Sequence, residues 1–209
     1  EGVYYMIVEY GSLLAYDINT EHLFYIPLPD KIEKTLYMQC VRISSDNRYL
    51  YIGASNGIIL YDIAMKTMRA LELPEGNEKI NTSVADLHED IHGRLWVATW
   101  GIGLSCIDNP LGKPSLKYHL SESTDPGLAS RRISALSSWK ETLLICTTNG
   151  LNRIIMTPEG ALKSVSTYRV DERRGKKSMS SDYIAAVDCE NDSTLWVGTI
   201  GGGLDRVVL

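Results

Sequence analysis

A near-regular internal repeat constrains the fold of this chain more than any other feature of its sequence. Five segments share one pattern, in which a β-rich run, a few small polar residues and a glycine precede a second β-rich run. They end at positions 17, 62, 108, 155 and 208, so successive units lie 45, 46, 47 and 53 residues apart. Each is typical of a β-hairpin whose glycine supplies the positive φ of the turn. The segments are IVEYGSLLAYD (7–17), IGASNGIILYD (52–62), VATWGIGLSCID (97–108), ICTTNGLNRII (145–155) and VGTIGGGLDRVV (197–208).

Two further strands are predicted around each hairpin. Four short antiparallel strands in a unit of about 45 residues form the blade of a β-propeller, and no long segment has the apolar spacing of an amphipathic helix. We therefore expect an all-β fold, a β-propeller of four-stranded antiparallel blades in which residues 1–209 form one region. The strands predicted before the hairpins are 38–43, 83–87, 133–136 and 183–187, and those after them are 23–26, 68–71, 116–119 and 166–169. The predicted blade boundaries are 1–30, 31–76, 77–122, 123–175 and 176–209.

Residues 88–92 read HEDIH and match the H-E-x-x-H pattern of zinc metalloproteases. That chemistry needs both histidines on one face of a helix, a turn apart, so that both reach the metal. Here the five residues lie between two predicted strands, 83–87 and 94–99, and Gly93 marks a turn. We therefore expect a β-turn in place of a helix, with no metal site, and we expect no cofactor elsewhere in the chain.

The charge and the lengths of the apolar runs argue against a nucleic-acid-binding or membrane-spanning protein. The net charge of −5 argues against a nucleic-acid surface, which normally carries a basic stripe. No apolar run approaches the roughly 18 residues needed to cross a bilayer, so we expect no membrane contact by this segment.

The four cysteines form no C-x-x-C pair and lie in apolar segments, which favours buried free thiols. The alternative is a Cys106–Cys146 bridge between neighbouring repeats, which needs an oxidising compartment.

The hairpins of the third and fifth units resemble the regulator-propeller repeat. The hallmark of that repeat is Asp-x-x-Gly-x-Leu-Trp-(Ile/Val)-Gly-Thr-x-x-Gly-Gly-Leu-x-Arg, and residues 195–206 follow its second half. The fourth unit, 144–153, resembles the Thr-x-Asn-Gly-Leu-Asn-Arg version, and 128–133 and 179–184 resemble the Leu-Ser-Ser-Asn-x-Ile opening of the first strand. The first two units depart from the pattern, with Tyr or Met in place of its Trp, so the resemblance is sharp from about residue 83. The matching residues of the third unit are Asp90, Gly93, Leu95, Trp96, Val97, Thr99, Gly103 and Leu104.

The resemblance implies a role as well as a fold. Regulator propellers form the sensor region of hybrid two-component regulators in gut-type bacteria, where two seven-bladed propellers stand in the periplasm ahead of a membrane helix and a histidine kinase. It therefore implies a periplasmic localisation and the sensing of oligosaccharides released from a polysaccharide. It also implies two further partners within the full-length protein, the remaining propeller blades and the kinase domains.

The two end units have fewer predicted strands than the four of a complete blade. The first begins at its second strand, 3–9, and the last ends at its third strand, 204–209. Because three strands at each end cannot share one four-stranded blade, we expect an open arc of about five blades, three full and two partial, in place of a closed ring. The end faces would then lack neighbours, and exposed apolar faces favour self-association or pairing with the missing blades.

Ligand-binding residues are predicted on the face that carries the B–C and D–A loops, where A to D name the strands of a blade in chain order. Trp100 breaks its own repeat, since the equivalent positions hold Ser55, Thr148 and Ile200. An exposed aromatic beside Arg and Asn suits a sugar ring, and Arg suits a carboxylate or sulfate. The alternative is that Trp100 covers the edge of the next blade. The predicted set is Asn56, Trp100, Arg131, Arg132, Asn149, Arg173, Arg174 and Tyr183.

The remaining tryptophans are expected elsewhere, and the sequence favours binding over catalysis. Trp96 and Trp196 recur at one strand position and are expected to pack between blades, while Trp139 is expected on the opposite face. Carboxylates such as Asp86 and Asp188 are spread over different units, with no sequence signature of an acid–base pair. We therefore predict a ligand sensor and not an enzyme. A propeller lyase or glycosidase and a protein-interaction scaffold are the alternatives, because the fold hosts many functions.

Overall fold

The computed structural model describes residues 2–8, 12–29, 37–74, 80–171, 173 and 178–208. Within them every extended element is a short β-strand, and consecutive strands pair antiparallel through tight turns. The strands are β1 (Val3–Val8), β2 (Ser12–Asp17), β3 (His22–Ile26), β4 (Met38–Ile43), β5 (Tyr49–Ala54), β6 (Gly57–Asp62), β7 (Thr67–Ala70), β8 (Val84–Glu89), β9 (Leu95–Thr99), β10 (Leu104–Asp108), β11 (Ser115–Leu120), β12 (Ile133–Trp139), β13 (Thr142–Thr147), β14 (Gly150–Met156), β15 (Leu162–Tyr168), β16 (Ile184–Asn191), β17 (Thr194–Thr199) and β18 (Gly203–Val208).

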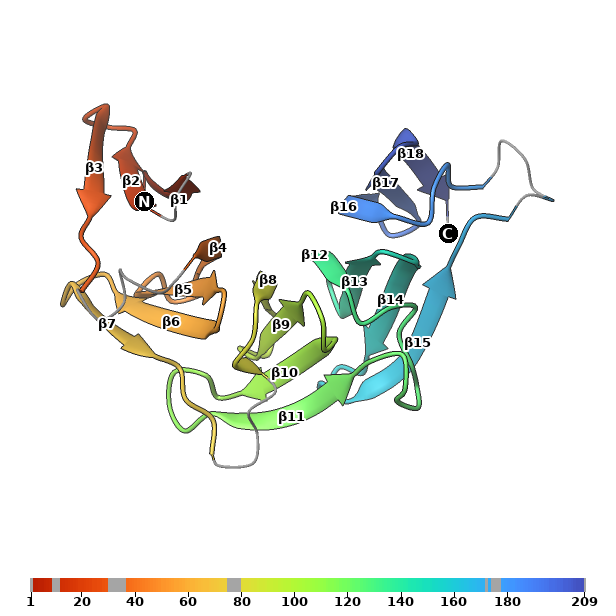
Figure 1. The fold of residues 1–209 in the computed structure, drawn as a ribbon, viewed down its shortest axis with the longest axis horizontal. Helices are drawn as coiled ribbons and strands as arrows, with labels where there is room; N and C mark the ends of the chain where they lie inside the picture. The colour runs from red at the N-terminus through yellow and green to blue at the C-terminus, as the bar shows by residue number, and fades with distance from the viewer. Residues whose placement is uncertain are drawn as a thin grey trace.

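These strands form five successive sheets, which we call blades 1 to 5. Blades 2, 3 and 4 have four strands each (β4–β7, β8–β11, β12–β15), whereas the described strands of blade 1 (β1–β3) and blade 5 (β16–β18) number three. Figure 1 shows the blades arranged as an open arc, with β4, β8, β12 and β16 on its inner side and β7, β11 and β15 on its outer side. The expected β-propeller arc of three full and two partial blades is confirmed.

In the B–C hairpins of blades 3, 4 and 5, the same hydrogen bond between a threonine and a glycine shapes the turn. Thr99, Thr147 and Thr199 each end a B strand, and each hydroxyl donates to the carbonyl of the glycine that opens or precedes strand C, at 2.8, 2.7 and 3.1 Å. Gly103 and Gly150 have φ of 104° and 122°, a region that L side chains rarely adopt. The repeated Thr and Gly of the sequence are therefore turn-forming residues.

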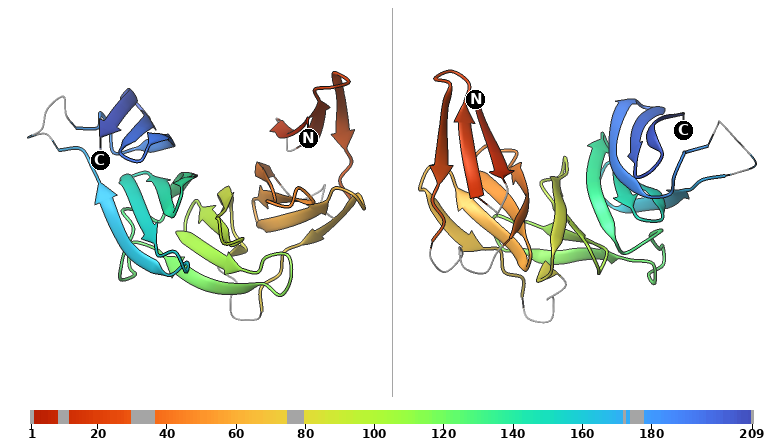
Figure 2. Two further views of the ribbon diagram at one scale, coloured as in Figure 1. Left: turned by 180° about the vertical axis from the view of Figure 1, so that it is seen from behind. Right: turned by 45° about the horizontal axis from the view of Figure 1, so that its top comes forward.

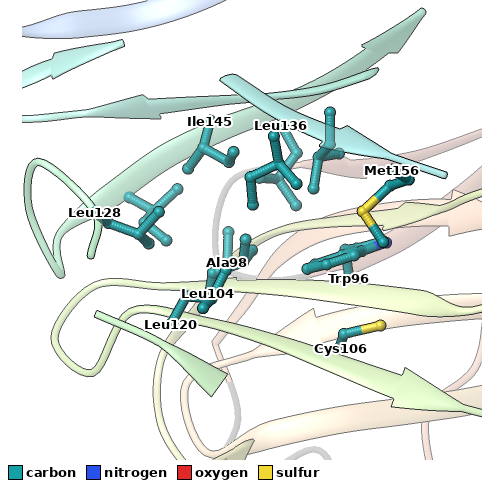
Figure 3. Close-up of a cluster of buried hydrophobic side chains, with 12 residues drawn as sticks. Trp96, Ala98, Leu104, Cys106, Leu120, Leu128, Leu136, Ile145 and Met156 are labelled. Carbon is teal, nitrogen blue, oxygen red and sulfur yellow. The ribbon is translucent and has the colours of Figure 1, made fainter. Parts of the chain in front are cut away.

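The hydrophobic core lies in layers between the blades. In the layer between blades 3 and 4, Trp96, Ala98 and Leu104 pack against Leu136 and Ile145, and Figure 3 shows the Trp96 ring beside Met156. Similar layers join blade 1 to 2, blade 2 to 3 and blade 4 to 5. Because the two faces of a strand alternate, each central strand supplies one layer with its odd residues and the next layer with its even ones.

Polar links also tie the blades together along the inner strands. The Asp86 carboxylate of β8 is 8% exposed and accepts two hydrogen bonds from the Arg42 guanidinium of β4, at 3.0 and 3.2 Å. It also accepts the backbone N–H of Leu136 in β12, at 2.9 Å. A single carboxylate of blade 3 therefore contacts blades 2 and 4.

The four cysteines are free thiols, so the alternative of a disulfide bridge is wrong. Cys106 faces blade 4, whereas Cys146 packs in the layer between blades 4 and 5. Burial raises the pKa of the Cys40, Cys106 and Cys146 thiols to about 12. These cysteines act as small core residues.

Trp96 and Trp196 occupy one register position in blades 3 and 5, but their surroundings differ. Trp96 is 1% exposed beneath blade 4, as expected, whereas Trp196 is 39% exposed. The expectation that both pack between blades therefore holds for Trp96 alone. No described sheet lies against the face of blade 5 that points away from blade 4.

This contrast gives a paired stability prediction. Trp96→Ala should lower the free energy of unfolding by about 3–5 kcal/mol, since it removes a buried ring and leaves a cavity. Trp196→Ala should cost less than about 1 kcal/mol, since its ring is partly in solvent. Urea denaturation of dilute protein measures both values. Equal losses in the two variants would contradict the layer assignment.

Candidate functional site

One repeated backbone hydrogen bond organises the end of the molecule that carries the B–C turns. In each of blades 2 to 5, the N–H of the first residue after strand B donates to the carbonyl of the residue just before strand A. The four bonds are Ser55–Tyr37 at 2.9 Å, Trp100–Ser83 at 3.2 Å, Thr148–Arg132 at 3.2 Å and Ile200–Tyr183 at 2.8 Å. Equivalent residues of successive blades are thereby held in the same position.

We call these eight residues the inner rim, because the A strands line the inner side of the arc. Figure 2 shows the arc from two further directions and keeps the same order of blades from the N-terminus to the C-terminus. Each of the four blades places at least one large or charged exposed side chain on the rim. Tyr37 is 70% exposed, Trp100 40% and Tyr183 36%, and Arg132 is also exposed.

Three of the sequence-predicted residues therefore share this rim: Trp100, Arg132 and Tyr183. Arg131 lies beside them on the same connection, with its backbone N–H bonded to Glu122 and its side chain exposed. Ile200 adds an apolar surface that is 54% exposed. The combination of exposed rings and guanidinium groups can stack against a flat ligand face and bind an anionic substituent.

The other predicted residues lie off the rim. The side-chain N–H of Asn149 donates to the carbonyl of Ala129 at 3.2 Å, and its own carbonyl accepts the Arg169 guanidinium at 3.0 Å, so Asn149 ties two connections of blade 4 together. Asn56 lies beside an open hollow of about 500 Å³ on blade 2, lined also by Glu72 and Asn81. Arg173 is 95% exposed and pairs with Asp171 at 3.5 Å, and Arg174 is outside the described residues.

The sequence-predicted set of rim residues omitted Tyr37, although its position before strand β4 is a recognisable signal. It precedes Met38 at the start of β4 as Tyr183 precedes Ile184 at the start of β16. Aligning the residues in front of the A strands, in addition to the hairpins, would have found it.

The HEDIH segment has neither the helix nor the geometry of a zinc protease. His88 and Glu89 end strand β8, a little further along than the predicted strand, and the next residues form the expected turn. Glu89 accepts bonds from Ser45, and Asp90 accepts the Arg94 guanidinium and the Trp96 indole N–H, both at 2.8 Å. In the described part of the chain, no three His, Cys, Asp or Glu side chains are grouped to hold a metal ion. Asp90 therefore holds the turn, whereas Glu89 joins it to the A–B turn of blade 2.

His88 has an unusual environment on the inner side of the arc. Its Nε2 atom is buried and has no hydrogen-bond partner. Burial lowers the pKa of His88 below its ordinary value of 6.5, the Arg42 charge lowers it further, and Asp90 and Asp86 act in the opposite direction. The neutral imidazole is therefore the form that the fold favours.

The solved structures that this chain resembles share its fold at low sequence identity. They include the β-propeller domain of Cps50 (Swd1) from Myceliophteria thermophila, with a TM-score of 0.67, 12% identity, and coverage of 100% of this chain and 67% of that one. Virginiamycin B lyase from Staphylococcus aureus matches with a TM-score of 0.61, 15% identity, and coverage of 100% and 70%. An extracellular domain named as part of a hybrid two-component system of B. thetaiotaomicron matches with a TM-score of 0.55, 15% identity, and coverage of 98% and 33%.

These likenesses establish a partial β-propeller and leave its activity open, since the propeller domain of Cps50, a lyase and an extracellular domain of a hybrid two-component system share the fold. The chain spans only part of each of these solved chains, and a third of the extracellular domain from B. thetaiotaomicron. No protein-family model and no curated protein matches the sequence. Within the described residues, no helix has the length and apolar character of a membrane-crossing segment.

The geometry of HEDIH predicts the metal content of the protein. Protein purified without chelators should contain no stoichiometric zinc by elemental analysis, because His88 and His92 do not share a helical face. The His88→Ala variant should give the same result. One zinc per chain that is lost in His88→Ala would contradict the assignment of this segment to a strand and turn.

The buried imidazole of His88 predicts a pH dependence of stability. As the pH falls below about 6.5, the unfolded chain gains a proton at this residue before the folded chain does, so folding stability falls with the pH. Above that value both states are neutral and the contribution vanishes. Urea unfolding at about pH 7.5 and about pH 5.5 should show a smaller loss of stability in His88→Gln than in the parent. An unchanged pH dependence in the variant would rule out His88 as the source.

Proposed function

We propose that this chain is the ligand-binding part of an extracytoplasmic sensor, that its inner rim binds an oligosaccharide, and that a histidine kinase elsewhere in a longer protein receives the signal. The observation that carries the proposal is the rim itself. Four blades each present a large or charged exposed side chain at one of the two rim positions: Trp100 at the position after strand B, and Tyr37, Arg132 and Tyr183 at the position before strand A. The packed layers between blades do not use these side chains.

The chemistry of the rim suits a sugar that carries acidic groups. Aromatic rings offer flat apolar surfaces to the C–H faces of a sugar ring, while their polar atoms remain available for hydrogen bonds. The guanidinium groups of Arg131 and Arg132 can each form two parallel hydrogen bonds to a carboxylate or sulfate. A uronic or sulfated oligosaccharide is therefore the ligand class that this rim favours.

Two observations support the sensor role beyond the rim. The motifs of blades 3 to 5 resemble the regulator-propeller repeat, and the solved folds similar to this chain include an extracellular domain named as part of a hybrid two-component system. A ligand that touches Trp100 and Arg132 also bridges blades 3 and 4, so binding can change how firmly neighbouring blades are held. Such a change could be passed along the arc to a domain joined to it.

Binding is favoured over catalysis by the groups that the rim offers. Its titratable side chains among the described residues are two tyrosines and one arginine, which form no carboxylate pair for hydrolysis of a glycosidic bond. The nearby Asp86 carboxylate is already used, since it accepts bonds from Arg42, Leu87 and Leu136. A lyase remains the alternative that the test below distinguishes.

A panel of neutral, uronic and sulfated oligosaccharides tests the proposal. Incubation with the protein should raise its melting temperature for one class of glycan, without release of products detectable by chromatography. Product formation would favour a propeller enzyme, and the absence of both effects would favour a protein-interaction scaffold.

The Trp100→Ala variant should weaken that binding by about 1–3 kcal/mol, or about 5- to 150-fold, with little change in the urea midpoint. Trp139→Ala is the matched control, because Trp139 is 39% exposed and lies at the A–B end of β12, where it bonds to Asp192. Calorimetric titration measures both affinities. A large fall in stability with unchanged affinity would show that Trp100 only covers a blade edge.

A further inference from the structure

The chain contains the dipeptide Asn-Gly twice, once in blade 2 and once in blade 4, at Asn56–Gly57 and Asn149–Gly150. Both lie in the B–C turn, and each glycine opens strand C of its blade at the same register position. The two glycines have φ of 135° and 122°, and both asparagines are exposed. The two turns therefore form a matched pair for any chemistry that belongs to Asn-Gly.

An asparagine that precedes glycine can react with its own backbone. The backbone nitrogen of the glycine attacks the side-chain carbonyl carbon of the asparagine, a C–N bond forms, and the side-chain amide leaves as ammonia with the proton of that nitrogen. Water then opens the imide ring at either carbonyl and gives aspartate or isoaspartate, in which the chain continues through the side chain. Water is the only co-reactant. Glycine favours the first step because no side chain hinders the approach.

In blade 4 both reacting groups are engaged by the fold. The N–H of Gly150, which would be the nucleophile, donates to the carbonyl of Asp182 at 2.7 Å. The side-chain amide nitrogen of Asn149 donates to the carbonyl of Ala129 at 3.2 Å, and the backbone carbonyl of Asn149 accepts the Arg169 guanidinium at 3.0 Å. The nucleophile and the amide must each give up a partner before they can meet.

A threonine of strand B holds the same turn more tightly. The Thr147 hydroxyl accepts the N–H of Asn149 at 3.2 Å and donates to the carbonyl of Gly150 at 2.7 Å. Blade 2 has Ala54 at this register position, since Ala54 pairs with its glycine as Thr147 pairs with Gly150. The turn of blade 2 therefore lacks this hydroxyl.

The surroundings of the two glycines differ in the space that they leave. The point where a Cβ would stand on Gly150 lies 2.7 Å from the carbonyl oxygen of Tyr168. The same point on Gly57 lies 3.6 Å from its nearest described neighbour outside the turn, the carbonyl oxygen of Ile80. Asn56 also borders the open hollow of about 500 Å³, through which water can reach it. Blade 2 thus leaves room for both the ring closure and the hydrolysis.

We propose that Asn56–Gly57 is a site of spontaneous deamidation in the folded protein, and that the fold protects Asn149–Gly150 from the same reaction. The contrast rests on the hydrogen bonds and the crowding of blade 4, because the two dipeptides share their sequence and their place in the hairpin.

The conversion alters the inner rim at blade 2. Asn56 directly follows Ser55, whose N–H donates to the carbonyl of Tyr37 at 2.9 Å and whose hydroxyl accepts the Tyr37 N–H at 3.3 Å. Either product adds one negative charge beside this pair. Isoaspartate also adds a carbon atom to the backbone next to Ser55, so the position of Tyr37 on the rim changes as the protein ages.

Storage of the whole chain in solution at mildly alkaline pH tests the proposal, because loss of the glycine N–H proton starts the reaction. Mass-spectrometric peptide mapping measures the acid formed at each asparagine, and enzymatic methylation of isoaspartate identifies that product. In the folded protein, acid should accumulate at Asn56 at least about tenfold faster than at Asn149, since the reaction in blade 4 must first break hydrogen bonds.

Two controls isolate the effect of the fold. In concentrated urea the hydrogen bonds of blade 4 are lost, so Asn56 and Asn149 should react at similar rates. The Asn56→Gln variant should form almost no acid at this position and should keep the urea midpoint of the parent, because Asn56 is exposed. Equal rates at the two sites in the folded protein, or a faster reaction at Asn149, would overturn the proposal. So would an Asn56 that reacts in urea and stays intact in the folded chain.

Discussion

The apolar contact between neighbouring blades is the interaction on which the rest of this structure depends. A sheet of three or four short strands is stable only when it buries an apolar face against another element. In blades 2 to 4 both faces are covered by sheets, so Leu50 and Ile52 point toward blade 1 while Tyr51 points toward blade 3. The turns, the inner polar links and the exposed rim are all held in place by these layers.

The packed layers between the blades position the inner rim, although the side chains of those layers are not part of it. The hydrogen bond from the residue after strand B to the residue before strand A sets the same backbone position in four blades. The side chains at the two positions differ from blade to blade, with Ser55, Trp100, Thr148 and Ile200 after strand B and Tyr37, Ser83, Arg132 and Tyr183 before strand A. A rigid scaffold with variable exposed positions is the usual origin of a binding surface on a repeat fold.

The repeat in the sequence was sufficient to predict the fold, because Gly turns and apolar alternation are local signals. The hairpins of 52–62 and 145–155 are where the pattern places them. Exposure could not be predicted in the same way. Trp96 and Trp196 have the same local sequence context, and only the presence or absence of a neighbouring sheet separates a 1% from a 39% exposed ring.

The candidate site was predictable in part for a similar reason. Trp100 could be singled out because it departs from its own repeat, whereas Asn149 looks equally exposed in sequence and is engaged by Ala129 and Arg169 in the fold. Those contacts join residues about 20 positions apart in the chain. They depend on how the D–A connection folds back over the B–C turn, and no short pattern encodes that path.

The position of Asp86 has a consequence for how this arc opens. In a stack of repeats, each unit ordinarily couples to its immediate neighbours, so disruption can spread inward one repeat at a time from either end. Asp86 couples blade 2 to blade 4 across blade 3, because Arg42 and the Leu136 amide share its carboxylate. Separating blade 3 from either neighbour therefore breaks a bond to the same carboxylate, which joins the three central blades through one buried group.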